Sequence, residues 1–338
     1  MNIKAYILHA WKMAGTDVHF KVSYPVFYRD KHGELEVISK EKLTYAELHD
    51  FIVENLAENI LEELDNKNEV DIGLSLYPSE QIKVMPVRLR INIFSDSKTL
   101  SMAVRILRQN IPHMQELGIP APIQALCDTA ENGLILFCGA TGSGKTTAMY
   151  SMIDHINQTK AKHIITLEDP TEYIIDYGRS IISQRELGTH THSFASGLRA
   201  ALREDPDVIV VGEMRDRETI ATALKAAETG HLVFSSIHAG AVSECLDRIL
   251  QYFPADEHEQ RVNEFANVFQ GIVGCKLLPR MSGDGRIAAY ETVLRTTATE
   301  SCIRTRDMFR IQNCMLPGEG MQTMERAIAA LKLQKLIA

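Results

Sequence analysis

The pattern of hydrophobic and polar positions changes near residue 110. Before it, short strand-like runs accompany one long run with helical spacing, Tyr45 to Leu64. The alternating stretch Ile82 to Phe94 predicts a pair of strands. The first part of the chain is therefore predicted to be an α+β domain. The apolar positions of the long helical run are Leu48, Ile52, Leu56, Ile60 and Leu61.

After residue 122, short apolar runs alternate with helical segments. Apolar spacing predicts helices over residues 194–202 and 220–227, the second ending at Gly230. Strands alternating with helices are typical of a parallel sheet wrapped by helices, so we predict an α/β fold here. Four nearly continuous apolar runs suit buried parallel strands: Leu134 to Cys138, Ile164 to Leu167, Val208 to Gly212 and Leu232 to Ser236.

Three prolines and a glycine interrupt regular structure between these two regions, in Asn110 to Pro122. We therefore predict a smaller N-terminal α+β domain over residues 1–108, a linker over 109–122 and a larger α/β domain over 123–338.

Composition excludes several classes of protein. A net charge of −8 argues against nucleic acid as a partner, because nucleic-acid surfaces cluster Lys and Arg. The six cysteines include no CxxC pair, so we expect reduced core residues and no zinc site. The longest apolar stretches are far shorter than the roughly 18 residues that cross a membrane, so we expect a cytoplasmic protein.

The clearest chemical signal is GATGSGKT at Gly139 to Thr146. This pattern arises by chance in roughly one chain in a hundred of this length. The strand GLILFC runs directly into it, and a helical pattern follows, which is the order that a phosphate-binding loop requires. The residues assigned to nucleotide binding are Gly139, Ala140, Thr141, Gly142, Ser143, Gly144, Lys145, Thr146 and Thr147.

Each part of this loop has a chemical reason. The glycines let backbone N–H groups encircle phosphate oxygens, and the helix N-terminus adds its positive dipole end. Lys145 can reach the β and γ phosphates, and the Thr146 hydroxyl can ligate Mg²⁺. The loop therefore predicts ATP or another nucleoside triphosphate, with Mg²⁺, as the cofactors.

Polar residues follow the later strands. Glu213 ends VIVVGE and is expected at the phosphate loop, holding Mg²⁺ through a water, because ligands bind at the carboxyl ends of parallel strands. The alternative is an exposed loop acid. Phosphoryl transfer to water also needs a group that orients the water, and spacing leaves Glu168, Asp169 and Glu172 all open for that role. His238 ends a third strand, which favours a sensor of bound nucleotide over a structural histidine.

Four segments in order, GATGSGKTT, ITLEDPTEY, ALREDPDVIVVGEMRD and TGHLVFSSIH, resemble the secretion ATPase superfamily, and most closely the type IV pilus retraction ATPases. In that family they are the Walker A motif, the Asp box, the Walker B motif and the His box, in a RecA-like domain. AGTDVHFKV and RLRINIF are similar to segments of the family's PAS-like N-terminal domain.

The resemblance implies roles that spacing alone left open. It makes Glu172 the water-activating glutamate and Glu213 the Walker B acid. It also implies that two histidines sense nucleotide and that two arginines approach the γ-phosphate, the alternative for the arginines being ordinary strand-surface residues. These four residues are His231, His238, Arg90 and Arg105.

The resemblance further implies a homo-hexameric ATPase motor that acts on an inner-membrane platform protein at the cytoplasmic side. ATESCIRT at Ala298 to Thr305 replaces the AIRNLIRE-like segment usual in retraction ATPases. Pilus or pseudopilus assembly, conjugation and type IV secretion therefore stay as alternatives. The lack of a tetracysteine insertion favours retraction or a compact secretion ATPase. A regulatory nucleotide-binding subunit is a further alternative, whereas the acidic balance opposes a nucleic-acid translocase.

Overall fold

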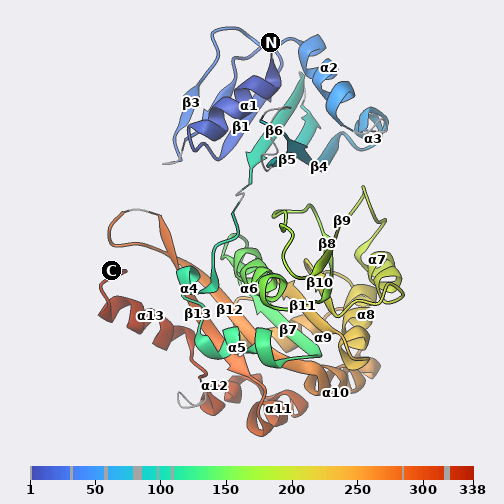
Figure 1. Cartoon of the computed structure of the whole chain (residues 1–338), viewed down its shortest axis with the longest axis vertical. Coiled ribbons are helices and arrows are strands. Elements are labelled where there is room, and N and C mark those ends of the chain that lie inside the picture. The colour runs from blue at the N-terminus through green and yellow to red at the C-terminus, as the bar shows by residue number, and fades with distance from the viewer. Residues whose placement is uncertain are drawn as a thin grey trace. The chain divides into compact units, whose positions relative to one another are not determined.

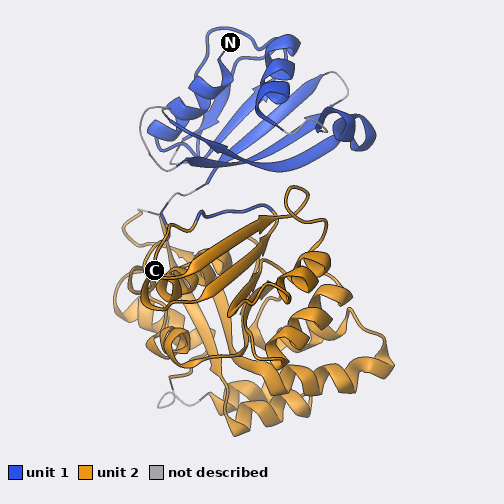
Figure 2. Cartoon of the chain, turned by 45° about the vertical axis from the view of Figure 1, so that its right-hand side comes forward, with its two compact units in different colours: residues 1–110, 170–174 blue, residues 111–169, 175–338 orange. Residues whose placement is uncertain are grey.

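A computed structural model describes residues 2–30, 33–56, 60–78, 86–96, 99–107, 110–283, 285–315 and 320–338. The chain forms two compact units (Figure 2). Unit 1 contains residues 1–110 and also residues 170–174, and unit 2 contains residues 111–169 and 175–338. The assignment of 170–174 to unit 1 was not anticipated from the sequence. No helix within the described ranges is long and apolar enough to span a membrane.

Among its described residues, unit 1 contains a six-stranded antiparallel sheet with strand order β3-β2-β1-β6-β5-β4 and three helices (Figure 1). Apolar side chains at alternate positions of β5 lie in the core, and Leu89 and Ile91 are fully buried there. The PAS-like character of this unit stays a prediction. The elements are α1 (Ile3–Lys12), β1 (Asp17–Lys21), β2 (Phe27–Arg29), β3 (Leu35–Val37), α2 (Tyr45–Asn55), α3 (Ile60–Lys67), β4 (Glu69–Leu76), β5 (Val87–Ser95) and β6 (Leu100–Ile106).

One prediction for this unit needs correction, and another lies partly outside the described residues. The predicted long helix is two helices, α2 and α3. The first ends because Leu56 adopts an extended backbone. The side-chain amide of Asn55 then donates to the carbonyl of Phe51 at 2.8 Å, in the last turn of α2. Apolar spacing continued through the break because both helices bury residues in the same core. The predicted strand pair contains one described strand, β5, and residues 82–85 lie outside the described ranges.

Unit 2 is built on a seven-stranded sheet with strand order β13-β12-β7-β11-β10-β8-β9. All neighbours are parallel except β13, which pairs antiparallel with β12. The four predicted strands are confirmed as β7, β8, β10 and β11, whereas the other three were not predicted. The strands are β7 (Gly133–Cys138), β8 (His163–Glu168), β9 (Ile181–Glu186), β10 (Val208–Val211), β11 (Leu232–Ile237), β12 (Phe269–Pro279) and β13 (Arg286–Leu294).

Helices cover both faces of this sheet (Figure 1). The connection β7-α6-β8 runs across the sheet in one direction and β10-α8-β11 in the other, so right-handed crossovers place α6 and α8 on opposite faces. The helices are α4 (Met114–Leu117), α5 (Ala121–Thr129), α6 (Lys145–Thr159), α7 (Phe194–Ala201), α8 (Arg217–Glu228), η1 (Val242–Glu244), α9 (Cys245–Leu250), η2 (Ala255–Glu257), α10 (His258–Val268), α11 (Thr297–Arg304), η3 (Met308–Arg310), α12 (Ile311–Cys314) and α13 (Met324–Leu333).

Replacing Ile91 by Ala tests the core of unit 1. We expect the free energy of unfolding of this unit to fall by about 2–5 kcal/mol, because the substitution leaves a cavity in a closed core. The single tryptophan, Trp11, packs against the same core and reports its unfolding by fluorescence in urea. Val53→Ala, at a side chain that is 56% exposed, is the control and should change stability by less than about 0.5 kcal/mol. Equal effects of the two substitutions would contradict this core.

Candidate nucleotide-binding site

The phosphate loop joins the end of β7 to the start of α6, and two of its glycines are required by geometry. Gly139 has φ +144°, and a Cβ there would lie 2.5 Å from the carbonyl oxygen of Cys275 and 2.6 Å from Oγ of Ser143. Gly144, at the N-cap of α6, has φ +95°. Side chains rarely adopt these conformations, so the loop depends on glycine at both positions.

Lys145 lies inside the loop. Its ammonium donates to the carbonyl oxygens of Gly139 at 2.8 Å and Ala140 at 3.0 Å, and the residue is only 8% exposed. The buried Ser143 hydroxyl has no hydrogen-bond partner among the described residues. A buried charge and an unsatisfied donor beside the N-terminus of a helix suit an anion such as phosphate.

A short turn after β10 holds Glu213. The Gly212 N–H donates to the carbonyl of Leu167 at 2.8 Å, and the Met214 N–H donates to the carbonyl of Ser236 at 2.9 Å. The turn is thereby bonded to the strands on both sides of β10. Because β10 lies two strands from β7, Glu213 lies at the same sheet edge as the phosphate loop, with about 10 Å between the two strands.

Two nitrogen-bearing side chains meet the Glu213 carboxylate. His238 Nε2 lies 3.2 Å from Oε1, and Arg215 Nη2 lies 2.8 Å from Oε2. Arg215 also lies 3.9 Å from the Asp169 carboxylate. The structure therefore brings His238 to Glu213, and it adds Arg215, which sequence reasoning missed although it follows Glu213 by two residues.

His231 lies at the other end of β11. Its ring nitrogen Nδ1 contacts the Ala226 carbonyl at 3.0 Å, and its own carbonyl accepts from the N–H of Gly133, where β7 begins. Leu232 to Ile237 spans about 17 Å of strand, so this histidine is far from the phosphate loop of its own chain. That His231 binds nucleotide stays a prediction.

Unit 1 carries the remaining predicted residues. Arg90 and Arg105 lie directly opposite each other on β5 and β6. Each is paired with a carboxylate of its own unit: Arg90 forms a salt bridge with Asp71, and Arg105 with Asp17 at 2.9 Å. Arg105 is exposed and Arg90 is half-buried. Their predicted contact with the γ-phosphate stays a prediction.

Glu172 belongs to the segment 170–174, which clusters with unit 1. Its two neighbours, Thr171 and Tyr173, are buried, and the Glu172 side chain itself is half-buried. Arg88 Nε donates to the carbonyl of Thr171 at 3.0 Å. Sequence reasoning missed Arg88, although it lies two residues before Arg90 on the same strand face.

A cavity of about 320 Å³ borders the phosphate loop and is lined in part by Ala140, Ser143 and Glu291. Glu291 is buried, which raises the pKa of its carboxyl group, and it accepts a hydrogen bond from the N–H of Val242 at 3.3 Å. Sequence reasoning did not consider this carboxyl group as part of the site.

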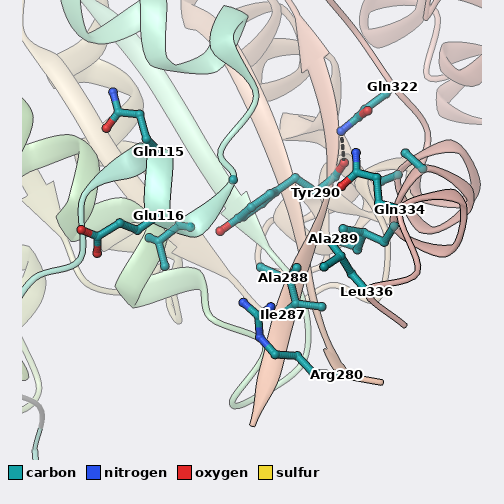
Figure 3. A pocket seen from close by; sticks show the side chains of 15 residues that line it. Gln115, Glu116, Arg280, Ile287, Ala288, Ala289, Tyr290, Gln322, Gln334 and Leu336 are labelled. Atoms are coloured by element: carbon teal, nitrogen blue, oxygen red, sulfur yellow. Dashed lines mark hydrogen bonds between the residues drawn. The ribbon is translucent and has the colours of Figure 1, made fainter. Parts of the chain in front are cut away.

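A second cavity, of about 430 Å³, lies among α4, β13 and α13 (Figure 3). Its lining includes Tyr290, Gln115, Gln334 and Arg280, and no residue of the phosphate loop. Tyr290 is only 3% exposed, and burial raises the pKa of its hydroxyl group. The cavity is therefore separate from the group of residues around Glu213.

A phosphate loop at the carboxyl edge of a parallel sheet, with an acid two strands away, is the arrangement of the P-loop ATPases, and this chain is one of them. More particularly, it belongs to the family of type II/IV secretion system proteins, whose model matches residues 2–323.

Individual relatives agree with this family. The chain is 36% identical to "Twitching motility protein" of Neisseria gonorrhoeae, over 91% of this chain and 80% of that protein. It is 32% identical to "Type IV pilus retractation ATPase PilT" of Pseudomonas aeruginosa, over 100% of this chain and 96% of that protein. The solved structure of the pilus retraction motor PilT with bound ADP is 39% identical, has a TM-score of 0.89 and matches 100% of this chain and 95% of that chain.

Gly139→Ala tests the loop geometry. The added methyl group clashes with the Cys275 carbonyl, so we expect binding of a fluorescent ADP analogue to weaken at least about tenfold. Gly230→Ala is the control, because Gly230 also has a positive φ, +106°, but a Cβ there meets open space far from the loop. It should cost about 1 kcal/mol of stability and leave binding unchanged. Wild-type binding by Gly139→Ala would show that the loop tolerates a side chain.

Proposed function

We propose that this chain is the ATP-hydrolysing motor of a type IV pilus, acting in retraction, or of a related secretion machine. The phosphate loop with Glu213 at the same sheet edge is the observation that carries the proposal. Similarity over the full length to proteins named as pilus motors supports it. The replacement of the AIRNLIRE-like segment keeps assembly, conjugation and type IV secretion as alternative machines.

The residues present fit a magnesium ion. Mg²⁺ prefers oxygen ligands and keeps several waters, and the Thr146 hydroxyl and the Glu213 carboxylate supply oxygens at one sheet edge. We propose that Thr146 ligates the ion and that Glu213 holds it through a water. Bound there, Mg²⁺ would offset the charge of the β and γ phosphates. Lys145 and the loop N–H groups bind the same phosphates.

Glu172 is the proposed general base. It accepts a proton from a water whose oxygen attacks the γ-phosphorus, while the bond from that phosphorus to the bridging oxygen breaks to yield ADP and phosphate. Glu172 lies three residues beyond Asp169, so the chain itself limits their separation to about 10 Å. Arg90 and Arg105 are proposed to stabilise the γ-phosphate charge, and His238, through Glu213, to sense bound nucleotide.

The assembly is proposed on the same basis. We infer a homo-hexamer, peripheral at the cytoplasmic side of the inner membrane, where motion driven by ATP would act on a platform protein. No zinc ion and no nucleic acid enter this proposal.

Glu172→Gln tests the chemistry. The amide keeps the size of the side chain but cannot accept the proton, so we expect kcat for ATP to fall about 10²–10⁴-fold while ADP binding is unchanged. Asp176→Asn, four residues along the same loop at an exposed position, is the matched control and should hydrolyse ATP like wild type. Equal rates of ATP hydrolysis by wild type and Glu172→Gln would contradict the proposed role of Glu172 as the general base.

Deletion of the gene in its native host tests which machine is driven. A retraction motor removes pilin from the filament, so its loss should leave more pili per cell by electron microscopy. Lys145→Ala, expressed in the deletion strain, should fail to restore the wild-type number, because the loop lacks the cation that binds phosphate. Loss of all pili would instead indicate that the protein drives pilus assembly.

A further inference from the structure

The loop between β8 and β9 carries Glu172 and contains no helix or strand. It runs from Asp169 to Ser180, and loops of this length without secondary structure usually serve a function. Only its middle, residues 170–174, belongs to unit 1, whereas both of its ends belong to unit 2. Unit 2 therefore holds both ends of the segment that carries Glu172.

One side chain of β9 bonds both ends. Gln184 lies opposite Thr166 in the parallel register of β8 and β9. Its amide nitrogen donates to Glu168 Oε1 at 3.0 Å, and its amide oxygen accepts from the Ile175 N–H at 2.9 Å. Glu168 is the residue before the loop begins, and Ile175 is the first residue after the segment 170–174. A single planar amide thus sets the separation of these two points.

The Glu168 side of this bridge is buried. Glu168 is 3% exposed, and its Oε1 also accepts from the Thr166 hydroxyl at 2.7 Å. A buried carboxylate is stable only when donors satisfy it, so the Gln184 amide has an electrostatic reason to keep its orientation. With its nitrogen fixed on Glu168, its oxygen is directed to Ile175.

A second buried amide holds the remainder of the returning chain. Asn157, on α6, is fully buried; its nitrogen donates to the Asp176 carbonyl at 2.8 Å, and its oxygen accepts from the Ser180 N–H at 3.4 Å. The chain from Ile175 to Ser180 is therefore bonded to the sheet and to α6. The two amides thus hold the chain on either side of the segment 170–174 to unit 2.

We propose that Gln184 is a positioning residue for hydrolysis: by bridging Glu168 and Ile175 it sets the separation of the ends of the segment that carries Glu172, and so orients Glu172 toward the attacking water. The inference rests on the proposed role of Glu172. Gln184 acts through the loop, so its loss lowers the rate of the chemical step and leaves nucleotide affinity unchanged, because the phosphate loop is on a different connection.

Gln184→Glu is the informative variant. It keeps the size and the oxygen that accepts from Ile175, but it removes the donor and places a second carboxylate against Glu168. We expect kcat for ATP to fall at least about tenfold at pH 8, with KM within about twofold of wild type. Mutual repulsion and burial raise the pKa of one carboxyl of the pair, so lowering the pH restores an O–H donor between them. The ratio of variant to wild-type kcat should therefore rise at least about threefold between pH 8 and pH 6.

Gln158→Glu is the matched control, because it makes the same chemical change beside Asp154 on the exposed face of α6. It should show wild-type kcat at both pH values. Gln184→Asn is the second variant: it keeps the amide but is one methylene shorter, so it cannot reach both partners. We expect it to lower kcat, to show no recovery at low pH, and to speed hydrogen exchange of the Ile175 amide.

The outcomes separate the two proposals. A wild-type kcat in Gln184→Glu and Gln184→Asn, beside an inactive Glu172→Gln, would overturn the positioning role and leave the proposed function intact. The positioning role also fails if Gln184→Glu lowers the melting temperature together with kcat, and if the ratio of its kcat to that of wild type is the same at pH 6 and pH 8. That pattern would be an effect of stability. A fully active Glu172→Gln overturns the proposed chemistry itself.

Discussion

The parallel register of β7, β11, β10 and β8 is the constraint on which the site depends. Ile237 of β11 lies opposite Cys138 of β7, and Val211 of β10 lies opposite Ser235 and Leu167. Strands that run in the same direction end at the same edge, so whatever follows each strand reaches that edge. The phosphate loop, Glu213, His238 and the Asp169 loop are brought together in this way by backbone hydrogen bonds alone.

The acids at this edge then need partners, because the sheet beneath them is apolar and buried. A carboxylate removed from water loses several kcal/mol unless donors replace the water. Glu213 is satisfied by His238 and Arg215, and Glu168 by Thr166 and Gln184. The same contacts fix the direction of each carboxylate, which is the preorganisation that electrostatic catalysis requires. The same interactions therefore stabilise the fold and orient the side chains of the site.

The loop after β8 differs from the other connections at this edge. The turn that holds Glu213 is bonded within unit 2, whereas residues 170–174 cluster with unit 1, where Arg88 bonds the Thr171 carbonyl. Glu172 is thus tied by covalent bonds to one unit and by packing to the other.

The sequence by itself determined the phosphate loop, the strands β7, β8, β10 and β11, and the placement of Glu213 and His238 after their strands. These features are local: a glycine pattern, a run of buried residues, and a polar residue at the end of a run. It did not determine the break between α2 and α3, the strands β9, β12 and β13, or the bridge from Gln184 to Glu168 and Ile175. Only the tertiary structure decided these, since apolar spacing records which face of an element is buried but not which distant strand it meets. A hydrogen bond between residues far apart in the chain exists only once the strand register has brought its donor and acceptor together.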